Sequence, residues 1–449
     1  MDAVIPRPPL PPGPFLVVGL ARSGVAAALA LRERGEDVAG CDAGRVPEEA
    51  LERLRGAGVD VRAGTDGVAL LEGRRAVVKS PGVPKEAAVI AAARERGVAV
   101  LGELEVGWRL LAGEEFVAVT GSNGKTTTVE LIGHIHREAG LPVCVAGNVG
   151  TALTSLPGTL APGTTVVCEA SSFQLEDTEA FAPEAAVLLN LAEDHLDRHG
   201  TFDAYRAAKL EVFARQPNEA VAVAPLGLGV EDLGGCARRV CFGSGPGAEL
   251  AERAGRLWWD ERPLLAVEEV RLRGAHNLQN AMAAAAVTLA RGVDAEAVCA
   301  GLRGFGGLAH RLEEIAGARG VLYVNDSKAT NVASALVGID SFPGGVHLIA
   351  GGRSKGGGFA ELAGPVAERC RAAYLIGETA AELRAALEPT GVPLHDCGDL
   401  EHAVAAASRA AREGDVVLLS PACPSFDQYA SYEERGDHFR ALARAAAGG

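Results

Sequence analysis

The sequence predicts a soluble α/β protein of three domains with mainly parallel sheets. The chain has 449 residues, which is too long for one hydrophobic core and fits about three domains of ordinary size. Three times it repeats a short apolar run, a Gly-rich turn and an Ala- and Leu-rich helical segment, the pattern of βαβ units. Hydrophobic residues make up 48% and charged residues 22%, as in globular proteins.

The first block begins with a predicted strand at Phe15–Val18, the turn GLARSG and a helix through Arg34. A second strand covers Glu36–Cys41 and ends at Asp42. The segments VDVRAG, AVVKSPGVP and VAVLGELE continue the alternation, and the block closes near residue 105. The preceding MDAVIPRPPLPPGP has neither the charged start nor the apolar stretch of a signal peptide, and its prolines predict an extended tail.

The second block places TGSNGKTT between a predicted strand, Phe116–Val119, and a helix through Ala139. A long helix at Asn277–Arg291 precedes the Gly-rich GLRGFGGLAHR, so we expect a boundary near residue 307. Further strands are predicted at Pro142–Ala146, Thr164–Cys168, Ala185–Leu189 and Ala220–Ala224.

The third block repeats the pattern in GVLYVNDSKATN, GVHLIAGGRSKGGG, AAYLIGE and DVVLLSPACPSFDQ. Its polar residues follow apolar strands. Because the carboxyl ends of parallel strands share one edge, we expect these residues to meet at a ligand site.

Charge and cysteine usage exclude several classes of protein. The net charge is 43 − 58 = −15, which disfavours nucleic acid and anionic membranes as partners. No window approaches the roughly 20 apolar residues of a membrane helix. The nine cysteines are dispersed without C-x-x-C spacing, so neither a disulfide framework nor a zinc site is indicated, and we expect a reducing compartment.

The strongest local signal is TGSNGKTT. Gly121 and Gly124 permit backbone geometry that points N–H groups at phosphates, Lys125 can reach the β- and γ-phosphates, and Thr126 can coordinate Mg²⁺. The position six before Lys125 is Val119 rather than glycine, so this is a shortened P-loop. The alternative is an accidental Gly-rich turn with an exposed lysine.

The turn GLARSG is a weaker signal. It has the outer glycines of a dinucleotide fingerprint, but Ala21 replaces the middle one, where the backbone approaches pyrophosphate. Asp42 ends the next strand, about where an acid would meet a ribose. We interpret this as a diphosphate site for another nucleotide, with simple turn geometry as the alternative.

Two further residues suggest a metal near the P-loop. Glu169 directly follows the strand TTVVC, and His195 lies in NLAEDHLDRH after another apolar strand. With the hydroxyl of Thr126 they make a plausible Mg²⁺ set, although a lone histidine is usually structural. Lys209 in YRAAK has the pattern of an ordinary helical lysine.

Taken in order, TGSNGKTT, CEASSFQLE, NLAEDHLDRH, YRAAK, GAHNLQNAMAA, AHRLE, NDSKATN and SPACPSFDQY resemble the Mur ligase family, the amide ligases that build the bacterial peptidoglycan precursor. The resemblance covers essentially the whole chain. SSFQLE, NDSKATN and SPAC-x-SFDQ resemble most closely the member that adds D-glutamate.

The resemblance implies a Rossmann-like domain for a UDP-sugar (residues 1–105), a central P-loop ATPase-like domain (106–307), and a Rossmann-like amino-acid domain (308–449) that closes over both. It implies a monomeric cytoplasmic enzyme that joins D-glutamate to UDP-N-acetylmuramoyl-L-alanine through an acyl phosphate. ATP and two Mg²⁺ ions would take part, and ADP and phosphate would be released.

The resemblance also assigns roles to residues. The nucleotide would contact Gly121, Ser122, Asn123, Gly124, Lys125, Thr126, Thr127, Asn277, Asn280, His310, Arg311 and Asp326. The UDP-sugar would contact Ala21, Arg22, Ser23, Asp42, Arg45, Ser80, Gly82 and Asn148. D-Glutamate would contact Lys328, Thr330, Lys355, Ser425, Phe426 and Tyr432. The metal set would be Thr126, Glu169, His195 and a carbamylated Lys209, and the catalytic set Lys125, His195 and Lys209.

Three alternatives remain open at this point. A sibling ligase would use another amino acid. A folylpolyglutamate-type ligase would lack the separate UDP-binding domain. A P-loop switch or binding protein would not ligate at all, and it would hydrolyse nucleotide whether or not an amino acid is present.

Overall fold

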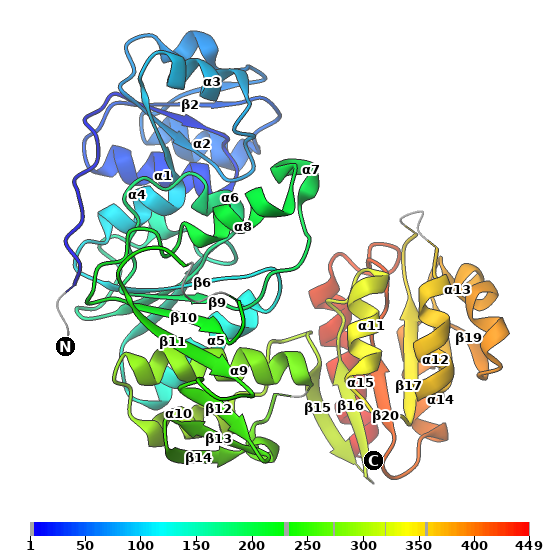
Figure 1. Ribbon diagram of the computed structural model, residues 1–449. Coiled ribbons are helices and arrows are strands. Elements are labelled where there is room, and N and C mark those ends of the chain that lie inside the picture. Colours follow the sequence, from blue (N-terminus) through cyan, green and yellow to red (C-terminus); the bar gives the residue numbers. More distant parts are fainter. Residues whose placement is uncertain (1–3, 229–232, 273, 319, 355–357, 449) are drawn as a thin grey trace. The chain divides into compact units, whose positions relative to one another are not determined.

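The α/β prediction with mainly parallel sheets is confirmed: the chain builds three sheets, each flanked by helices (Figure 1). None of the helices in the described part of the chain is both long and apolar enough to cross a membrane. The structure is a computed structural model that describes residues 4–228, 233–272, 274–318, 320–354 and 358–448.

The chain divides into two compact units. The N-terminal unit contains Met1–Val270 and Ala275–Phe305, and the C-terminal unit contains Arg271–Gly274 and Gly306–Gly449. The first two sheets belong to the N-terminal unit and the third to the C-terminal unit.

The first sheet is parallel, with strand order β3-β2-β1-β4-β5. The order reverses between β1 and β4, which is where such sheets bind ligands. Both of these strands are fully buried, as their continuous apolar sequences require. The elements are β1 (Phe15–Val18), α1 (Arg22–Glu33), β2 (Val38–Asp42), α2 (Glu48–Gly56), β3 (Asp60–Ala63), η1 (Val68–Leu71), β4 (Ala76–Lys79), α3 (Ala88–Glu95) and β5 (Ala99–Gly102).

Helix α4 (Glu103–Leu110) joins the first two sheets, and it is buried over most of its length. Val106 packs in the core of the first sheet, whereas Leu104 and Trp108 pack in the core of the second. A helix that is apolar on several sides has to be enclosed. It therefore fixes the two sheets as parts of one unit.

The central sheet has the order β14-β13-β12-β11-β10-β9-β6-β8-β7. It is parallel from β7 to β12, whereas β12, β13 and β14 pair antiparallel, which the sequence did not predict. Its strands are β6 (Glu115–Thr120), β7 (Val143–Gly147), β8 (Thr165–Glu169), β9 (Ala185–Leu188), β10 (Val221–Pro225), β11 (Arg238–Gly243), β12 (Leu250–Arg253), β13 (Arg256–Trp259) and β14 (Arg262–Ala266).

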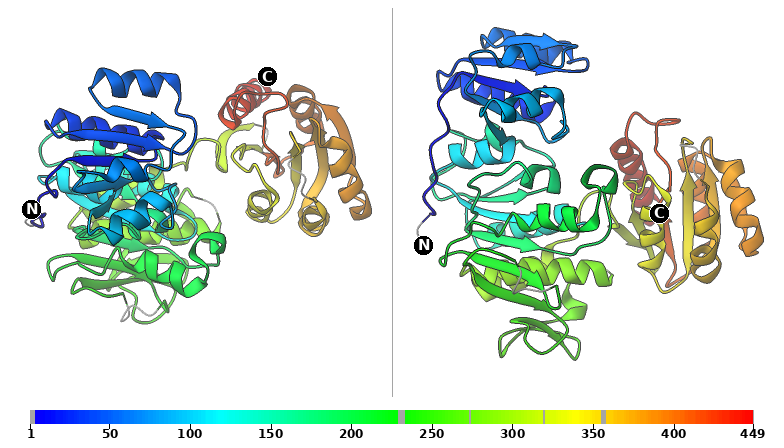
Figure 2. Two further views of the ribbon diagram at one scale, coloured as in Figure 1. Left: turned by 90° about the horizontal axis from the view of Figure 1, so that it is seen from above. Right: turned by 45° about the horizontal axis from the view of Figure 1, so that its top comes forward.

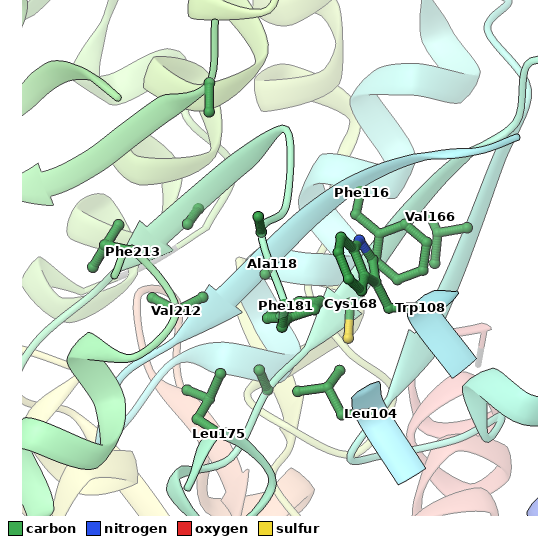
Figure 3. Packing of buried hydrophobic residues seen from close by; sticks show 14 of the residues in the cluster. Leu104, Trp108, Phe116, Ala118, Val166, Cys168, Leu175, Phe181, Val212 and Phe213 are labelled. Carbon is green, nitrogen blue, oxygen red and sulfur yellow. The ribbon is translucent and has the colours of Figure 1, made fainter. Parts of the chain in front are cut away.

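Helices and loops cover both faces of this sheet. One face carries an aromatic core in which Trp108, Phe116 and Phe181 meet edge to face (Figure 3). The helices and 3₁₀ turns of this part are α5 (Lys125–Glu138), η2 (Leu153–Ser155), α6 (Ser172–Leu175), α7 (Leu196–His199), α8 (Phe202–Leu210), η4 (Val267–Glu269), α9 (Ala275–Ala290) and α10 (Ala295–Gly304).

The sheet of the C-terminal unit has the order β15-β16-β20-β17-β18-β19, with only the edge pair β15–β16 antiparallel. Helices α11, α12 and α13 cover one face, and α14 and α15 cover the other (Figure 2). The elements are β15 (Glu313–Ala318), β16 (Val321–Asn325), α11 (Val332–Asp340), β17 (Val346–Gly351), η5 (Ala360–Leu362), α12 (Ala363–Arg369), β18 (Cys370–Ile376), α13 (Ala380–Leu387), η6 (Glu388–Thr390), β19 (Leu394–Gly398), α14 (Leu400–Ala410), β20 (Val416–Leu419) and α15 (Tyr432–Gly448).

Candidate functional site

The predicted phosphate loop runs from the end of β6 to the start of α5 at Lys125. Gly121 and Gly124 have φ angles of 150° and 86°, at which a residue with a side chain would be strained. Lys125 Nζ donates to the carbonyls of Gly121 and Ser122, each at 2.9 Å. Asn190, which sequence reasoning missed, holds the loop from the end of the neighbouring β9: its carbonyl accepts from Ser122 N–H at 3.1 Å.

Thr126 and Glu169 lie together at one edge of the central sheet. The Thr126 hydroxyl donates to Glu169 Oε2 at 2.8 Å, and the Asn148 amide donates to Oε1 at 3.1 Å. The contact arises because β6 and β8 are paired neighbours whose polar ends coincide. A hydroxyl beside a carboxylate is an oxygen-rich donor set of the kind Mg²⁺ prefers, so these residues fit that ion.

Lys209, on α8, is buried, with 2% of its surface exposed. Its Nζ donates to the Gly121 carbonyl at 2.8 Å, so it shares that oxygen with Lys125. Burial, followed by the neighbouring Lys125 cation, lowers the pKa of Lys209 from 10.5 to about 7. Two lysine amines therefore converge on one point of the phosphate loop.

His195 lies beside this cluster with its side chain 48% exposed. Its φ angle of 51° falls in the left-handed region, and such backbone strain gathers at functional sites. The ring centroids of His195 and Phe173 are 4.8 Å apart. Among the described residues no three His, Cys, Asp or Glu side chains are grouped to hold a metal, so metal ligation by His195 stays a prediction.

The predicted asparagines of α9 meet the phosphate loop. A Cβ at Gly124 would lie 2.2 Å from Asn280 Oδ1, so only glycine allows this close approach. Asn280 also donates to Asn277 Oδ1 at 3.2 Å. Of the other loop residues, Asn123 is exposed and Thr127 is buried. Segments about 150 residues apart in the sequence therefore lie against each other at the phosphate loop.

A cavity of about 950 Å³ runs along α1, from Arg22 at its N-terminal end to Arg34 after its last residue. Its lining includes Ala21, Arg22, Asp42 and Arg45. The Asp42 carboxylate accepts from the main-chain N–H groups of Leu20 and Gly44, each at 2.7 Å, so it joins the loops after β1 and β2.

Other residues predicted to contact the UDP-sugar lie nearby. The Ser80 hydroxyl donates to the Gly19 carbonyl at 2.7 Å. Ser23 is half-buried, whereas Gly82 is exposed, and a Cβ added to it would meet no other atom within 4 Å.

In the C-terminal unit, Asp326 lies buried at the end of β16. Ser420 Oγ donates to its carboxylate at 2.8 Å and Leu312 N–H at 3.3 Å. Burial raises the pKa of Asp326 to about 7. His310 has a φ angle of 62°, its carbonyl accepts from Lys328 N–H at 3.0 Å, and the half-buried Arg311 follows it.

The residues predicted for D-glutamate occupy loops of the same unit. Lys328 Nζ lies 5.6 Å from the centroid of the Tyr432 ring. The Ser425 hydroxyl is buried and has no hydrogen-bond partner among the described residues, whereas Phe426 is 60% exposed. Thr330 N–H donates to the carbonyl of Lys328 at 2.8 Å. Lys355 lies outside the described residues.

Arg435 is the main residue of this unit that sequence reasoning missed. It is 1% exposed, and its guanidinium donates to the Ser327 hydroxyl at 2.9 Å and to the carbonyls of Ser327 and Cys423 at 2.9 and 3.1 Å. It therefore joins the NDSK and SPAC loops. Its only sequence signal is a charged residue one position before a glycine in the EERGDHF segment.

Comparison with known proteins agrees with this arrangement. Three family models match: "Mur ligase MurD-like, N-terminal domain" at residues 14–102, "Mur ligase middle domain" at 119–229, and "Mur ligase, glutamate ligase domain" at 310–423. The chain is 43% identical over 459 residues to a UDP-N-acetylmuramoylalanine–D-glutamate ligase of Anaeromyxobacter dehalogenans, with 95% of this chain and 96% of the relative covered. It is 39% identical to the ligase of that name from Acidobacterium capsulatum, with 95% of each covered.

Solved structures support the fold. MurF from Acinetobacter baumannii has a TM-score of 0.59 at 18% identity, covering 96% of this chain and 93% of that one. MurF from Thermotoga maritima, solved in complex with ADP, has a TM-score of 0.56 at 17% identity, covering 92% and 95%. Relatives about 40% identical over nearly the whole length establish kinship. The chain therefore belongs to the Mur ligase family and, within it, to the UDP-N-acetylmuramoylalanine–D-glutamate ligases.

Proposed function

We propose that the protein is an ATP-dependent ligase that joins D-glutamate to UDP-N-acetylmuramoyl-L-alanine and releases ADP and phosphate. The observation that carries the proposal is the convergence of Lys125 and Lys209 on the Gly121 carbonyl, beside the Thr126–Glu169 pair. Lys125, on a glycine loop at a helix N-terminus, suits a polyphosphate, and Lys209 lies beside it. The relatives' names supply the substrate class.

The reaction begins when the terminal carboxylate of the UDP-sugar attacks the γ-phosphorus of ATP, forming an acyl phosphate and ADP. Phosphorylation is needed because an oxide is a poor leaving group. Lys125 neutralises the transferring phosphoryl group, and Mg²⁺ held by Thr126 and Glu169 would reduce the repulsion between the two anions. The amine of D-glutamate then attacks the carbonyl carbon, an amide forms, and phosphate leaves.

The proposal includes a carbamate on Lys209. With a pKa of about 7, about half of this amine is neutral at pH 7, against roughly one part in 3,000 at a pKa of 10.5. The neutral amine adds to CO₂ and releases a proton, which leaves an anionic carbamate. We propose that this anion and His195 serve a second Mg²⁺.

The remaining assignments follow the two units. We assign contacts with the nucleotide to Asn277, Asn280, His310 and Arg311, and contact with its ribose to Asp326. The UDP end of the acceptor goes to the cavity at α1, and D-glutamate goes to the C-terminal unit. We also propose that the protein acts as a monomer in the cytoplasm, in keeping with its free cysteines. Sedimentation at working concentration checks the monomer.

Phosphate release tests the function. With UDP-N-acetylmuramoyl-L-alanine, ATP and Mg²⁺, we expect turnover with D-glutamate and little with L-glutamate, L-alanine or diaminopimelate. A sibling ligase would prefer another amino acid. A non-ligating P-loop protein would release phosphate equally without any amino acid, and either result would overturn the proposal.

A further inference from the structure

Arg198 connects the loop after β4 with the segment that contains His195. It lies in α7, three residues after His195, and its side chain is 16% exposed. The guanidinium donates to the carbonyls of Pro81 and Val83 at 3.0 and 3.1 Å and to Glu176 Oε1 at 3.0 Å. Pro81 and Val83 belong to the loop after β4, so Arg198 reaches from the central sheet to the first sheet inside one compact unit.

The same guanidinium lies 4.3 Å from the centroid of the Phe173 ring. That ring also contacts His195, with a centroid distance of 4.8 Å. The ring centroids of His195 and Tyr205 are 6.5 Å apart, and the Tyr205 hydroxyl is 2.9 Å from Ser122 Oγ in the phosphate loop. A continuous line of side chains therefore runs from the loop after β4 through Arg198, Phe173, His195 and Tyr205 to the phosphate loop.

A plain structural role would be to clamp the two sheets together, but other contacts already do this. Lys79 and Asp177 form a buried ion pair across the same boundary, and Gly102 N–H donates to the Asp177 carbonyl at 3.0 Å. Helix α4 packs into both cores. Arg198 adds something more specific, since two of its three hydrogen bonds go to main-chain carbonyls of one short loop.

We propose that Arg198 is a positioning residue. Through its contact with Phe173 it fixes the position of the loop Ser80–Val83 relative to His195. The inference rests on the proposed function, in which His195 serves the second Mg²⁺, and it places the sugar part of the UDP-sugar at this loop, where Ser80 and Gly82 are expected to contact it. The carboxylate of the acceptor then arrives in line with the phosphoryl group it attacks. Small misplacements at this stage are costly, because the reaction depends on near-attack geometry.

Steady-state kinetics test the role with two variants, Arg198→Ala and Arg198→Lys. Lysine keeps the charge but lacks the planar fork that reaches two carbonyls and a carboxylate at once. We expect both variants to lose about 10- to 100-fold in kcat/KM for the UDP-sugar, as the loss of an orienting group does. The dissociation constants of UDP alone and of ATP, measured by calorimetry, should change by less than about twofold.

Arg109→Ala is the matched control. Arg109 is also a buried arginine of this unit, donating to Glu105, Glu179 and the Pro9 carbonyl, but it touches neither loop. It should keep kcat/KM. If Arg198→Lys keeps wild-type kinetics, Arg198 is not a positioning residue. The same conclusion follows if the binding of UDP and ATP weakens as much as turnover.

Hydrogen–deuterium exchange separates this inference from the proposed function, because it needs no activity. In ligand-free protein, Arg198→Ala should speed exchange in peptides covering residues 81–87 and 195–199 together, whereas Arg109→Ala should leave both unchanged. Unchanged exchange in either peptide would overturn the bridge. Failure of the wild type to release phosphate with D-glutamate would overturn the proposed function alone.

Discussion

Replacing Lys209 by arginine removes the one property that sets this residue apart from an ordinary lysine. The residue is 2% exposed, and its Nζ lies 2.8 Å from the Gly121 carbonyl that Lys125 also contacts. Burial and the Lys125 charge together lower its pKa by about 3.5 pH units, from 10.5 to about 7, so it supplies roughly a thousand times more neutral amine at pH 7 than an exposed lysine. Arginine stays protonated and cannot form a carbamate.

We expect Lys209→Arg to lower D-glutamate-dependent phosphate release by about 10²- to 10³-fold, the range found when one preorganised electrostatic group is lost. Lys85→Arg, at an exposed position, is the matched control and should be unaffected. With ¹³C-labelled bicarbonate, the wild type should show a carbamate signal that Lys209→Arg lacks, and removal of CO₂ should lower wild-type turnover. Full activity of Lys209→Arg, or wild-type turnover indifferent to CO₂, would refute the reasoning.

The lowered pKa of Lys209 also makes the free energy of unfolding depend on pH. Between pH 7 and 10.5 the native state binds fewer protons at Lys209 than the unfolded state does, so its contribution to the free energy of unfolding rises with pH across this window. Lys209→Met should remove that slope. Denaturant unfolding at several pH values measures it, and equal slopes in the two proteins would show that the lysine titrates normally.

The remaining predictions concern both units. Glu169→Gln should keep the contact with Thr126 but raise the half-saturating Mg²⁺ concentration for phosphate release by about 10- to 100-fold; an unchanged Mg²⁺ dependence would remove Glu169 from the metal set. Because burial raises the pKa of Asp326 from 3.8 to about 7, the native state binds more protons there, and stability falls as pH rises through this window. Asp326→Asn should flatten that fall in denaturant titrations, and an identical pH profile would contradict the shift. Arg435→Lys, which loses hydrogen bonds to Ser327 and Cys423, should lower the free energy of unfolding of the C-terminal unit by about 2–4 kcal/mol, and a loss near zero would show that the loops hold without it.

Local sequence signals predicted the strands and the phosphate loop well. The predicted strand Phe15–Val18 coincides with β1, and the predicted helix after TGSNGKTT is α5. Both rest on short-range physics, because a buried parallel strand needs an unbroken apolar run and a phosphate loop needs glycine at positive φ. The hairpins of β12, β13 and β14 escaped prediction because these strands are only four or five residues long and charged residues stand at their ends and in the turn between β13 and β14.

Polar residues at the site were harder to predict than the loop that holds them. Ser80 and Asn148 were expected to line the sugar path, yet Ser80 bonds to Gly19 and Asn148 to Glu169. Sequence position places such a residue at the correct sheet edge, but its partner depends on segments far along the chain. Their contact with the sugar stays a prediction. Asn280 does lie where a nucleotide contact would need it, because it meets Gly124 of the phosphate loop directly although the two are about 150 positions apart in the sequence.

The arginines show why sequence reasoning missed the supports of the site. Arg7, Arg198 and Arg435 each donate to main-chain carbonyls, those of Trp108, Pro81 with Val83, and Ser327 with Cys423. Loops that leave a sheet and the last turn of a helix, where Trp108 lies, have carbonyls without regular partners, and burying such groups unpaired is costly. A guanidinium offers five donors in a rigid fork, so one arginine can satisfy several carbonyls and fix the loop's course. In the sequence these residues look like surface charges. Every residue has a main-chain carbonyl, so the sequence does not show which carbonyls these arginines contact. A largely buried arginine bonded to loop carbonyls is therefore a structural signal for a positioned loop, and the loops held by Arg198 and Arg435 both belong to the proposed substrate sites.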